Sequence, residues 1–333
     1  MKRILVICPH PEHVAPGQRL KFEQYFHHWR ANGYEVVVSP FMTERFQQVV
    51  YQPGRILEKV LWVAWGYLRR LRDLARLPLY DGAYIFLWVT PFGPPLFEWL
   101  YWIGAKQFIY DIDDMVFLGH SSVANRAVQF LKGRRKMTYL MRKADHVIVC
   151  TPYLDAFVRR HNQRTTDISS TIETDCYLPV NPYTNSGRLT LGWSGSHSTA
   201  RYLHLLDEVL RDLAKELDFC LRVIGDPEFA IDGVDIDARA WNVGTEVEDL
   251  QRIDIGLYPL PEERWVLGKS GLKALQYMAL GIPTVATDFG TARRIIREGV
   301  NGFLVTDPEG WRSRIKMLAA DPALRRSLGT AAR

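Results

Sequence analysis

Short apolar runs alternate with longer amphipathic segments along this chain, and the alternation occurs in two series. The second series begins near residue 189. Strands and helices that alternate in this way form βαβ units, whose strands lie parallel. The runs that predict strands are 3–8, 34–39, 83–89, 107–110, 146–150, 189–193, 219–224, 240–243, 253–257 and 284–286. The pattern predicts two α/β halves, each a doubly wound, Rossmann-like parallel sheet.

Helical periodicity and turn residues complete this division of the chain. The segments that predict helices are 18–31, 55–76, 152–161, 199–217, 246–251, 272–280 and 308–319, with a short aromatic helix inside 91–104. Residues 179–187 carry two prolines, two asparagines, a serine and a glycine, a composition typical of a linker. We therefore expect an N-terminal domain at 1–180, a linker at 181–188 and a C-terminal domain at 189–333. A site is expected in the cleft that the two domains face.

The stretch 265–305 is the most informative part of the sequence. Gly268 and Gly271 enclose Lys269 and Ser270 directly before an apolar, helix-compatible run. Backbone N–H groups at the start of a helix are open to an anion, and the helix dipole adds positive potential there. Lys269 and Lys273 lie four residues apart, on one helical face. The stretch predicts a phosphate site, and the alternative is a surface loop before an ordinary amphipathic helix.

A second candidate phosphate site follows the strand predicted at 189–193. Gly195 and Ser196 form a small-residue turn between that strand and the next helix. The context allows close backbone approach to a phosphate, with His197 and Arg201 as the nearest basic residues. The alternative is a simple helix cap, in which Ser198 or Thr199 begins the helix. The two interpretations are compatible.

The stretch 265–305 resembles the signature of retaining family 4 (group 1) glycosyltransferases, which have the GT-B fold. That family has E-x-F-G-x-x-x-x-E-A-M-A-x-G-x-P-V-V-A, and Gly268 and Gln276 stand here where its two glutamates would be. The positions that match the motif and the later N-G-F-L are Gly271, Met278, Ala279, Gly281, Pro283, Val285, Ala286 and Asn301–Leu304.

The resemblance implies a GT-B glycosyltransferase of hexosyltransferase type that moves a sugar from a UDP-, GDP- or dTDP-sugar to a hydroxyl acceptor. The C-terminal domain would bind the donor, with Gly271 and Lys269 at the diphosphate, assisted by Lys273. Gln276 would contact the ribose without the charge of the family's glutamate. The resemblance also implies a terminal helix that crosses back onto the N-terminal domain, and the sequence through Arg333 has no segment that we assign to it.

Three acidic residues directly follow the strand predicted at 107–110. In the resembling family a polar residue near this place contacts the transferred sugar, so Asp113 and Asp114 are candidate catalytic residues. Asp111 is expected to hold the loop through backbone N–H groups, and in the alternative interpretation all three acids are turn and cap residues. The Asp111-x-Asp113 spacing matches a metal motif, but no further ligands complete it. We predict no metal and no cofactor.

Further cleft candidates follow the first predicted strand, where the sheet presents its carboxyl edge. They are His10, Gly17 and Arg19, and the alternative for Arg19 is a solvated side chain in the first helical turn. The dinucleotide fingerprint G-x-G-x-x-G is absent after Cys8, which argues against a dehydrogenase. No serine lies in a G-x-S-x-G context, which argues against a hydrolase of that type.

The amino-acid composition indicates the class of protein and its cellular compartment. Apolar residues make up 47% and charged residues 24%, as in soluble globular proteins. Cys8, Cys150 and Cys220 sit in or beside apolar runs, and with Cys176 they show no metal-binding spacing. Unpaired buried thiols indicate a reducing compartment. With no signal-peptide pattern and no run of eighteen apolar residues, we predict a cytoplasmic protein.

Charge is uneven along the chain. Residues 1–185 hold 23 Lys and Arg against 16 Asp and Glu, whereas residues 186–333 hold 19 against 21. A basic half favours an anionic partner, and the segment 55–76 combines tryptophans with arginines, as does a helix on a membrane surface. The alternative is a solvated domain helix. The basic segment 132–143 supports the membrane interpretation, which suggests a lipid-linked acceptor in cell-envelope polysaccharide or glycolipid synthesis at the inner face of the plasma membrane.

Other functions stay open at the level of sequence. A GT-B relative that epimerises nucleotide sugars would have the same cleft and no acceptor. A non-catalytic nucleotide-sugar-binding protein would fit the two missing glutamates at 268 and 276. Nucleic-acid binding is not predicted, because the basic half carries no aromatic-interleaved platform and no known motif.

Overall fold

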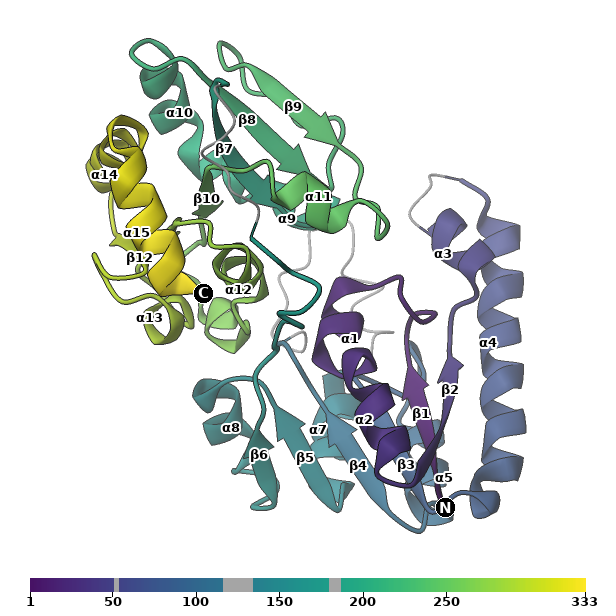
Figure 1. The fold of residues 1–333 in the computed structure, drawn as a ribbon. Coiled ribbons are helices and arrows are strands. Elements are labelled where there is room, and N and C mark those ends of the chain that lie inside the picture. Colours follow the sequence, from purple (N-terminus) through teal and green to yellow (C-terminus); the bar gives the residue numbers. More distant parts are fainter. Residues whose placement is uncertain (51–53, 116–133, 180–186) are drawn as a thin grey trace. The chain divides into compact units, whose positions relative to one another are not determined.

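A computed structural model describes residues 1–50, 54–115, 134–179 and 187–333 (Figure 1). The chain divides into two compact units, Met1–Ser170 and Thr171–Arg333. Each unit contains a six-stranded parallel sheet. The predicted fold class, two doubly wound α/β sheets, is confirmed. Most of the predicted linker at 181–188 lies outside the described residues.

The first sheet has the strand order β2-β1-β3-β4-β5-β6. Its strands are β1 (Lys2–Cys8), β2 (Tyr34–Pro40), β3 (Gly82–Phe86), β4 (Phe108–Asp111), β5 (His146–Val149) and β6 (Thr165–Asp167). The helical segments of this unit are α1 (Pro16–Lys21), η1 (Glu23–Tyr25), α2 (Phe26–Ala31), α3 (Glu44–Val50), α4 (Ile56–Arg76), η2 (Leu77–Leu79), α5 (Leu96–Gly104), α7 (Arg134–Lys143) and α8 (Pro152–Val158).

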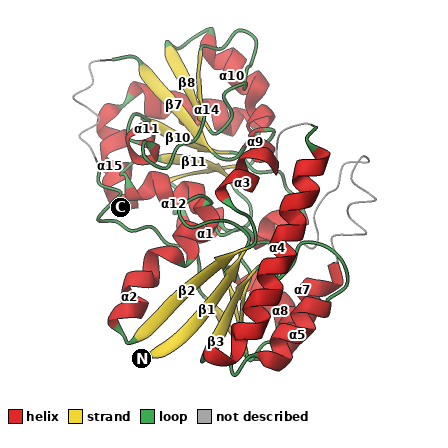
Figure 2. Ribbon diagram, turned by 90° about the vertical axis from the view of Figure 1, so that its right-hand side faces the viewer, coloured by secondary structure: helices red, strands yellow, loops and turns green. Residues whose placement is uncertain are grey.

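Alternate residues of β1 supply the two cores of this unit. Leu5 and Ile7 pack with side chains of α5, α7 and α8 on one face. Val6 and Cys8 pack with Phe22, which follows α1, and with aromatic residues of α2 and β3 on the other. Because successive side chains of a strand point to opposite faces, a fully apolar strand indicates a sheet that is covered on both sides, as Figure 2 shows.

The second sheet has the order β12-β11-β10-β7-β8-β9. Its strands are β7 (Leu189–Ser194), β8 (Phe219–Ile224), β9 (Ile236–Arg239), β10 (Ile255–Tyr258), β11 (Thr284–Thr287) and β12 (Gly302–Val305). The helical segments are α9 (His197–Ala200), η6 (Leu203–Leu206), α10 (Asp207–Ala214), α11 (Glu246–Leu250), η7 (Arg264–Gly268), α12 (Leu272–Ala279), α13 (Ala292–Ile295), α14 (Pro308–Ala320) and α15 (Pro322–Ala332). Helices α10 and α14 cover one face, and α12 and α13 the other.

Several predicted elements were wrong in their bounds. The strand predicted at 240–243 was placed too late in the chain. The strand of this region is β9, which pairs with β8 and ends at Arg239. The Arg239 carbonyl accepts from the Gly225 N–H. The helix predicted at 18–31 breaks at Phe22 into α1, η1 and α2. The helix predicted at 199–217 breaks into α9, η6 and α10. The strand β6 lies in a region that the sequence indicated only as polar.

No helix in the described parts of the chain is both long enough and apolar enough to cross a bilayer. Cys8 and Cys150 are buried, Cys220 is half-buried and Cys176 is exposed, and none of the four forms a disulfide. Burial raises the pKa of the Cys8 and Cys150 thiols, so both are held protonated and unreactive.

Candidate functional site

The second unit has a topological switch point between β7 and β10. From β7 the chain proceeds outward to β8 and β9, and it then returns to build β10, β11 and β12 on the other side. Ligands of doubly wound sheets bind at such a point, beyond the carboxyl ends of the strands. The loops that leave β7 and β10 there contain every residue that the sequence predicts for donor binding except Lys273 and Gln276, which lie on α12.

The loop after β7 is packed so closely that Gly195 has no room for a side chain. A Cβ built on Gly195 would overlap the Trp193 ring and lie 2.7 Å from Cε of Lys273. The neighbouring Gly225 has φ +112°, and its own Cβ would overlap the Gly195 carbonyl. Glycine is therefore required at both positions, and the backbone at Gly195 lies directly beside Lys273.

Ser196 is exposed and caps the four-residue helix α9. Its N–H donates to Thr199 Oγ1 at 3.1 Å, and its hydroxyl lies 3.0 Å from Ser198 Oγ. His197 forms an ion pair with Asp226 at 3.0 Å, and this carboxylate raises the pKa of the imidazole. The turn is thus a helix cap, but the cap is Ser196 and the helix begins at His197, rather than at Ser198 or Thr199 as predicted. Phosphate binding by Ser196 stays a prediction.

Gly271 begins α12 in the left-handed region, with φ +79°. This conformation favours glycine, and a Cβ here would lie 2.9 Å from Cδ1 of Ile295, which would have to shift. The residue turns the chain sharply out of η7 into α12. It thereby leaves the first backbone N–H groups of this eight-residue helix directed at the end of the sheet, where an anion is favoured.

Lys273 and Lys269 each lie against a tryptophan. Nζ of Lys273 is 5.0 Å from the centroid of the Trp193 ring, and Nζ of Lys269 is 4.9 Å from that of Trp265. Burial of the ammonium and the nearby charge of Lys269 lower the pKa of Lys273 to about 7. No carboxylate within the described ranges forms an ion pair with Lys273. A cation held in this way gains most from a bound anion.

Gln276 is 3% exposed and belongs to a buried polar cluster. Its amide donates to Glu246 Oε1 at 3.0 Å and to the Tyr177 hydroxyl at 3.2 Å. Tyr177 donates to Glu246 Oε2 at 2.9 Å, and the Trp241 indole donates to Oε1 at 3.0 Å. Sequence reasoning missed Glu246, Tyr177 and Trp241. The only available signal was the position of Glu246 at the start of a short predicted helix.

In the first unit, the predicted acidic cluster follows β4 at the carboxyl edge of the sheet. Asp111 is 1% exposed and accepts from the Tyr84 hydroxyl, with Lys21 Nζ at 3.7 Å. Burial raises the pKa of Asp111, and Lys21 opposes this effect. The expectation that backbone N–H groups hold Asp111 was wrong, because side chains of β3 and α1 hold it instead.

Asp113 and Asp114 differ in how they are held. A Cβ on Gly17 would lie 3.3 Å from Asp113 Oδ2, so α1 begins directly beside that carboxylate. The Asp113 carbonyl accepts from the Cys150 thiol at 3.0 Å. Asp114 Oδ1 accepts from the N–H of Met115 at 2.6 Å, which is the contact of a turn residue. The structure thus brings Gly17 together with Asp113, and contact of Asp113 or Asp114 with a transferred sugar stays a prediction.

His10 and Arg19 lie on the same edge of this unit. Nδ1 of His10 is 2.8 Å from Gln47 Oε1, and burial lowers the pKa of the imidazole, so His10 is neutral at pH 7. The buried amide of Gln18 donates to the His10 carbonyl at 2.9 Å and to Glu23 at 2.5 Å, and it fixes the loop after β1. The Arg19 side chain is only half-exposed, unlike a fully solvated one.

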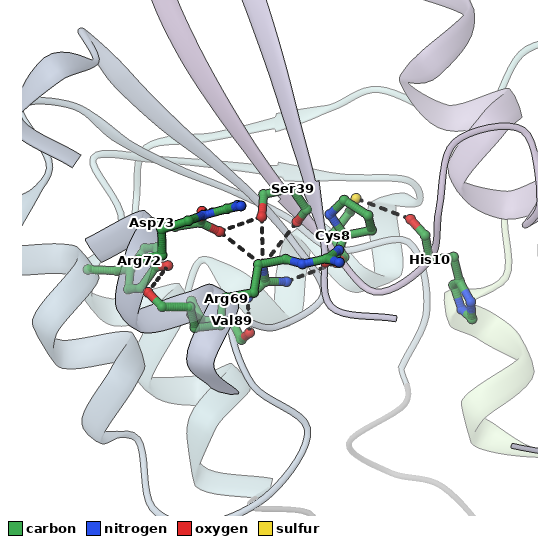
Figure 3. Close-up of polar contacts among 10 residues, drawn as sticks. Cys8, His10, Ser39, Arg69, Arg72, Asp73 and Val89 are labelled. Atoms are coloured by element: carbon green, nitrogen blue, oxygen red, sulfur yellow. Dashed lines mark hydrogen bonds and ion pairs between the residues drawn. The ribbon is translucent and has the colours of Figure 1, made fainter. Parts of the chain in front are cut away.

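Arg70, in the middle of α4, binds the carboxyl ends of this sheet together. Its side chain is fully buried, and it donates to the carbonyls of Cys8 at 3.0 Å, Ser39 at 3.0 Å and Val89 at 2.8 Å. Asp73 lies 3.5 Å from the guanidinium and also accepts from the Ser39 hydroxyl. Figure 3 shows Cys8, Ser39, Asp73 and Val89, the partners of this side chain, around the ends of β1 and β2.

Replacing Arg70 by methionine should lower the free energy of unfolding by about 3–5 kcal/mol, because breaking a buried charge network leaves its partners uncompensated. Arg76→Met, at an exposed position of the same helix, should change it by less than about 0.5 kcal/mol. Urea unfolding followed by circular dichroism measures both. A loss below about 1 kcal/mol for Arg70→Met would contradict this assignment.

Among the described residues, no group of three or more His, Cys, Asp or Glu side chains is placed to hold a metal ion, and the absence of a metal stays a prediction. The predicted donor residues Gly195, Lys269, Gly271 and Lys273 gather around the switch point of one sheet. The backbone beside the two glycines and the ammonium groups of the two lysines are the kinds of group that bind a diphosphate.

Comparison with known proteins agrees with this geometry. The family model described as "Glycosyl transferases group 1" matches residues 188–321, which include all of the predicted donor residues. A search of curated proteins found no match.

Solved structures match the whole chain. Sucrose-phosphate synthase from Thermosynechococcus elongatus has a TM-score of 0.69 at 18% identity, over 100% of this chain and 93% of that one. HepE of Anabaena in complex with UDP-glucose has a TM-score of 0.66 at 16% identity, with coverage of 100% and 93%. The lipopolysaccharide outer core galactosyltransferase WaaB has a TM-score of 0.55 at 14% identity, with coverage of 96% and 90%. The chain therefore has the GT-B fold, and its second unit matches the group 1 glycosyltransferase family model over residues 188–321.

Proposed function

We propose that this glycosyltransferase takes a sugar from a UDP-sugar and transfers it, with retention of the anomeric configuration, to a hydroxyl acceptor. The observation that carries the proposal is the position of Lys273, a desolvated ammonium with a pKa of about 7, beside the glycine backbone at the switch point. The choice of UDP is supported by HepE, a protein of the same fold that binds UDP-glucose. Hexosyl transfer and retention rest on the family resemblance.

The donor diphosphate would lie between the start of α12 and the loop after β7. Negative charge grows on the diphosphate as the bond to the sugar breaks, and fixed positive groups stabilise this charge best. Lys269, Lys273 and the N–H groups after Gly271 would supply them without a metal or cofactor. Gln276, oriented by Glu246 and Tyr177, would contact the ribose.

The first unit would bind the acceptor and the reacting face of the sugar. Asp113 would contact the transferred sugar, Asp114 would hold the loop, and Gly17 with Arg19 would border the acceptor. The galactosyltransferase WaaB, which has the same fold, supports a role in cell-envelope polysaccharide or glycolipid synthesis. A cytoplasmic location is part of the proposal, supported by the buried Cys8 and Cys150, neither of which forms a disulfide.

A thermal-shift panel tests the donor first. UDP should raise the Tm by several degrees, because a ligand at about a hundredfold excess over its Kd adds about 2.7 kcal/mol to stability. GDP and dTDP at the same concentration are the matched controls, and they should shift the Tm less. Absence of a shift with all three nucleotides would overturn the donor site.

Release of UDP from a UDP-sugar separates transfer from the other functions that the sequence left open. A transferase should release UDP faster when a hydroxyl acceptor is added. An epimerase would change the sugar without an acceptor, and a binding protein would release no UDP at all. Either result would refute transfer while leaving the nucleotide site intact. NMR of the product's anomeric proton tests retention.

A further inference from the structure

The long helix α4 turns an apolar face outward. Six large apolar residues on it are between 49% and 74% exposed, and we name them the α4 stripe: Leu57, Val60, Leu61, Trp65, Leu68 and Leu71. Their spacing of three and four residues places them on one side of the helix. At a rise of about 1.5 Å per residue the stripe is roughly 20 Å long.

The opposite side of α4 carries the polar and small residues, and that side is buried. Gly66 allows the ring of Phe41 to approach so closely that a Cβ would lie 2.5 Å from it. Arg70 is fully buried and Asp73 is 4% exposed. A surface helix of a soluble protein normally buries its apolar stripe and exposes its charges. In α4 this arrangement is reversed.

The apolar surface continues from α4 onto its neighbours. Helix α5 packs against both α4 and η2, and Figure 2 shows α4 and α5 on the same face of their sheet. Leu79 of η2 is 62% exposed, and Trp99 and Ile103 of α5 are 44% and 58% exposed. The single charged residue of α5, Glu98, is buried and lies 3.4 Å from Lys136 Nζ. Apolar patches of this extent on a soluble protein mark an interaction site.

Basic residues border this surface. The segment 55–76 has six basic residues and two acidic ones. Both acids are neutralised, Glu58 by Arg45 and Arg55 and Asp73 by Arg70 and Arg72. Arg55, Arg72 and Arg76 are exposed at or near the two ends of α4. The charge that this face presents to a partner is therefore positive.

We propose that the α4 stripe, together with the exposed apolar residues of η2 and α5, binds the surface of an anionic lipid bilayer with α4 parallel to the membrane plane. Apolar side chains with tryptophan would enter the headgroup boundary, and the arginines would contact anionic headgroups. A second copy of the chain is a poorer occupant, because a two-fold interface would set each basic border against its own copy. The proposal concerns only this surface and is independent of the transferase activity.

Co-sedimentation of the full chain with vesicles tests this proposal. The wild type should bind vesicles made of equal parts of phosphatidylglycerol and phosphatidylcholine, and bind pure phosphatidylcholine much more weakly. The double variant Leu61→Ser/Leu68→Ser should reduce the partition coefficient at least about tenfold. The matched control is Leu205→Ser/Val243→Ser, which removes two exposed apolar residues of the second unit and should bind like the wild type.

A second variant tests the basic residues that border the α4 stripe. Arg76→Gln, at an exposed position, should weaken binding to the anionic vesicles about fivefold and leave binding to neutral vesicles unchanged. Equal binding by the Leu61→Ser/Leu68→Ser variant and the wild type would overturn the proposal. A wild-type dimer in sedimentation equilibrium that binds no vesicles and is dissociated by that double variant would also overturn it, in favour of self-association.

Discussion

Replacing Lys273 by methionine should weaken UDP binding at least roughly thirtyfold, because losing one partner of a buried charge pair costs about 2–5 kcal/mol. Methionine keeps the length and most of the volume of the side chain, so packing against Trp193 should survive. Removal of a desolvated ammonium should also leave the free protein at least as stable as the wild type. Isothermal titration calorimetry with UDP measures the affinity.

The matched control for this change is Lys215→Met. Lys215 is an exposed lysine of the same unit that pairs with Asp212 at 3.0 Å, and its loss should leave UDP affinity unchanged. Equal affinities for Lys273→Met and the wild type would remove the diphosphate from this position. Lys269→Ala should give a smaller loss, since Lys269 acts both on the ligand and in lowering the pKa of Lys273.

The low pKa of Lys273 also predicts that UDP affinity depends on pH. A bound diphosphate favours the charged ammonium, so it raises the pKa of Lys273 above its free value of about 7. Below that pH the group is already charged, and above it binding must take up a proton. UDP affinity should therefore fall between pH 7 and 9, by at most about tenfold per unit. The terminal phosphate, with a pKa of about 6, no longer titrates there, and the affinity of Lys273→Met should be flat.

Asp113→Asn should lower the transfer rate by about a hundredfold to a thousandfold, the loss typical when one electrostatic contact to a transition state is removed. The affinity for UDP should not change, because Asp113 lies in the first unit and the proposed diphosphate site in the second. Asp114→Asn should lower transfer less, since this residue contacts the N–H of Met115. Radiolabelled sugar transfer and calorimetry measure the two quantities.

The control for losing a negative charge is a variant of a carboxylate at the other end of the same sheet. Asp81 precedes β3 and is paired with Lys106 at 3.6 Å, far along the strand from the edge that carries Asp113. Asp81→Asn should leave transfer unchanged. Full activity in both Asp113→Asn and Asp114→Asn would exclude this loop from the chemistry.

The apolar runs of the sequence predicted most of the strands, because a parallel strand covered on both faces must be apolar at nearly every position. Helix breaks could not be predicted in this way. At Phe22 the backbone leaves the helix with φ −139°, ψ −28°, where Gln18 and Glu23 are drawn into contacts with the loop after β1. Those contacts join residues eight and ten positions apart, which is beyond the three- and four-residue spacing of a helical pattern.

The candidate site also has one part that the sequence predicted and one part that it could not predict. Gly271 and the two lysines form a local motif, and their spacing alone suggested a phosphate. The cluster around Gln276 draws Tyr177 from 99 residues away and Glu246 from 30 residues away, so only the fold could bring it together. For α4, the sequence indicated tryptophan and arginine on one helix but not that Arg70 would be buried. Because the Arg70 side chain is buried, the outer face of α4 is more apolar than the composition of the helix suggested.

The buried guanidinium of Arg70 also governs how this part of the molecule can open. Its three carbonyl partners belong to residues 8, 39 and 89, which adjoin three neighbouring strands of the sheet. Detaching α4 would break all three hydrogen bonds at once and leave the three carbonyls without their buried donor, a cost of several kcal/mol. Helix α4 and the carboxyl ends of β1, β2 and β3 are therefore expected to open together, as one cooperative unit of local unfolding.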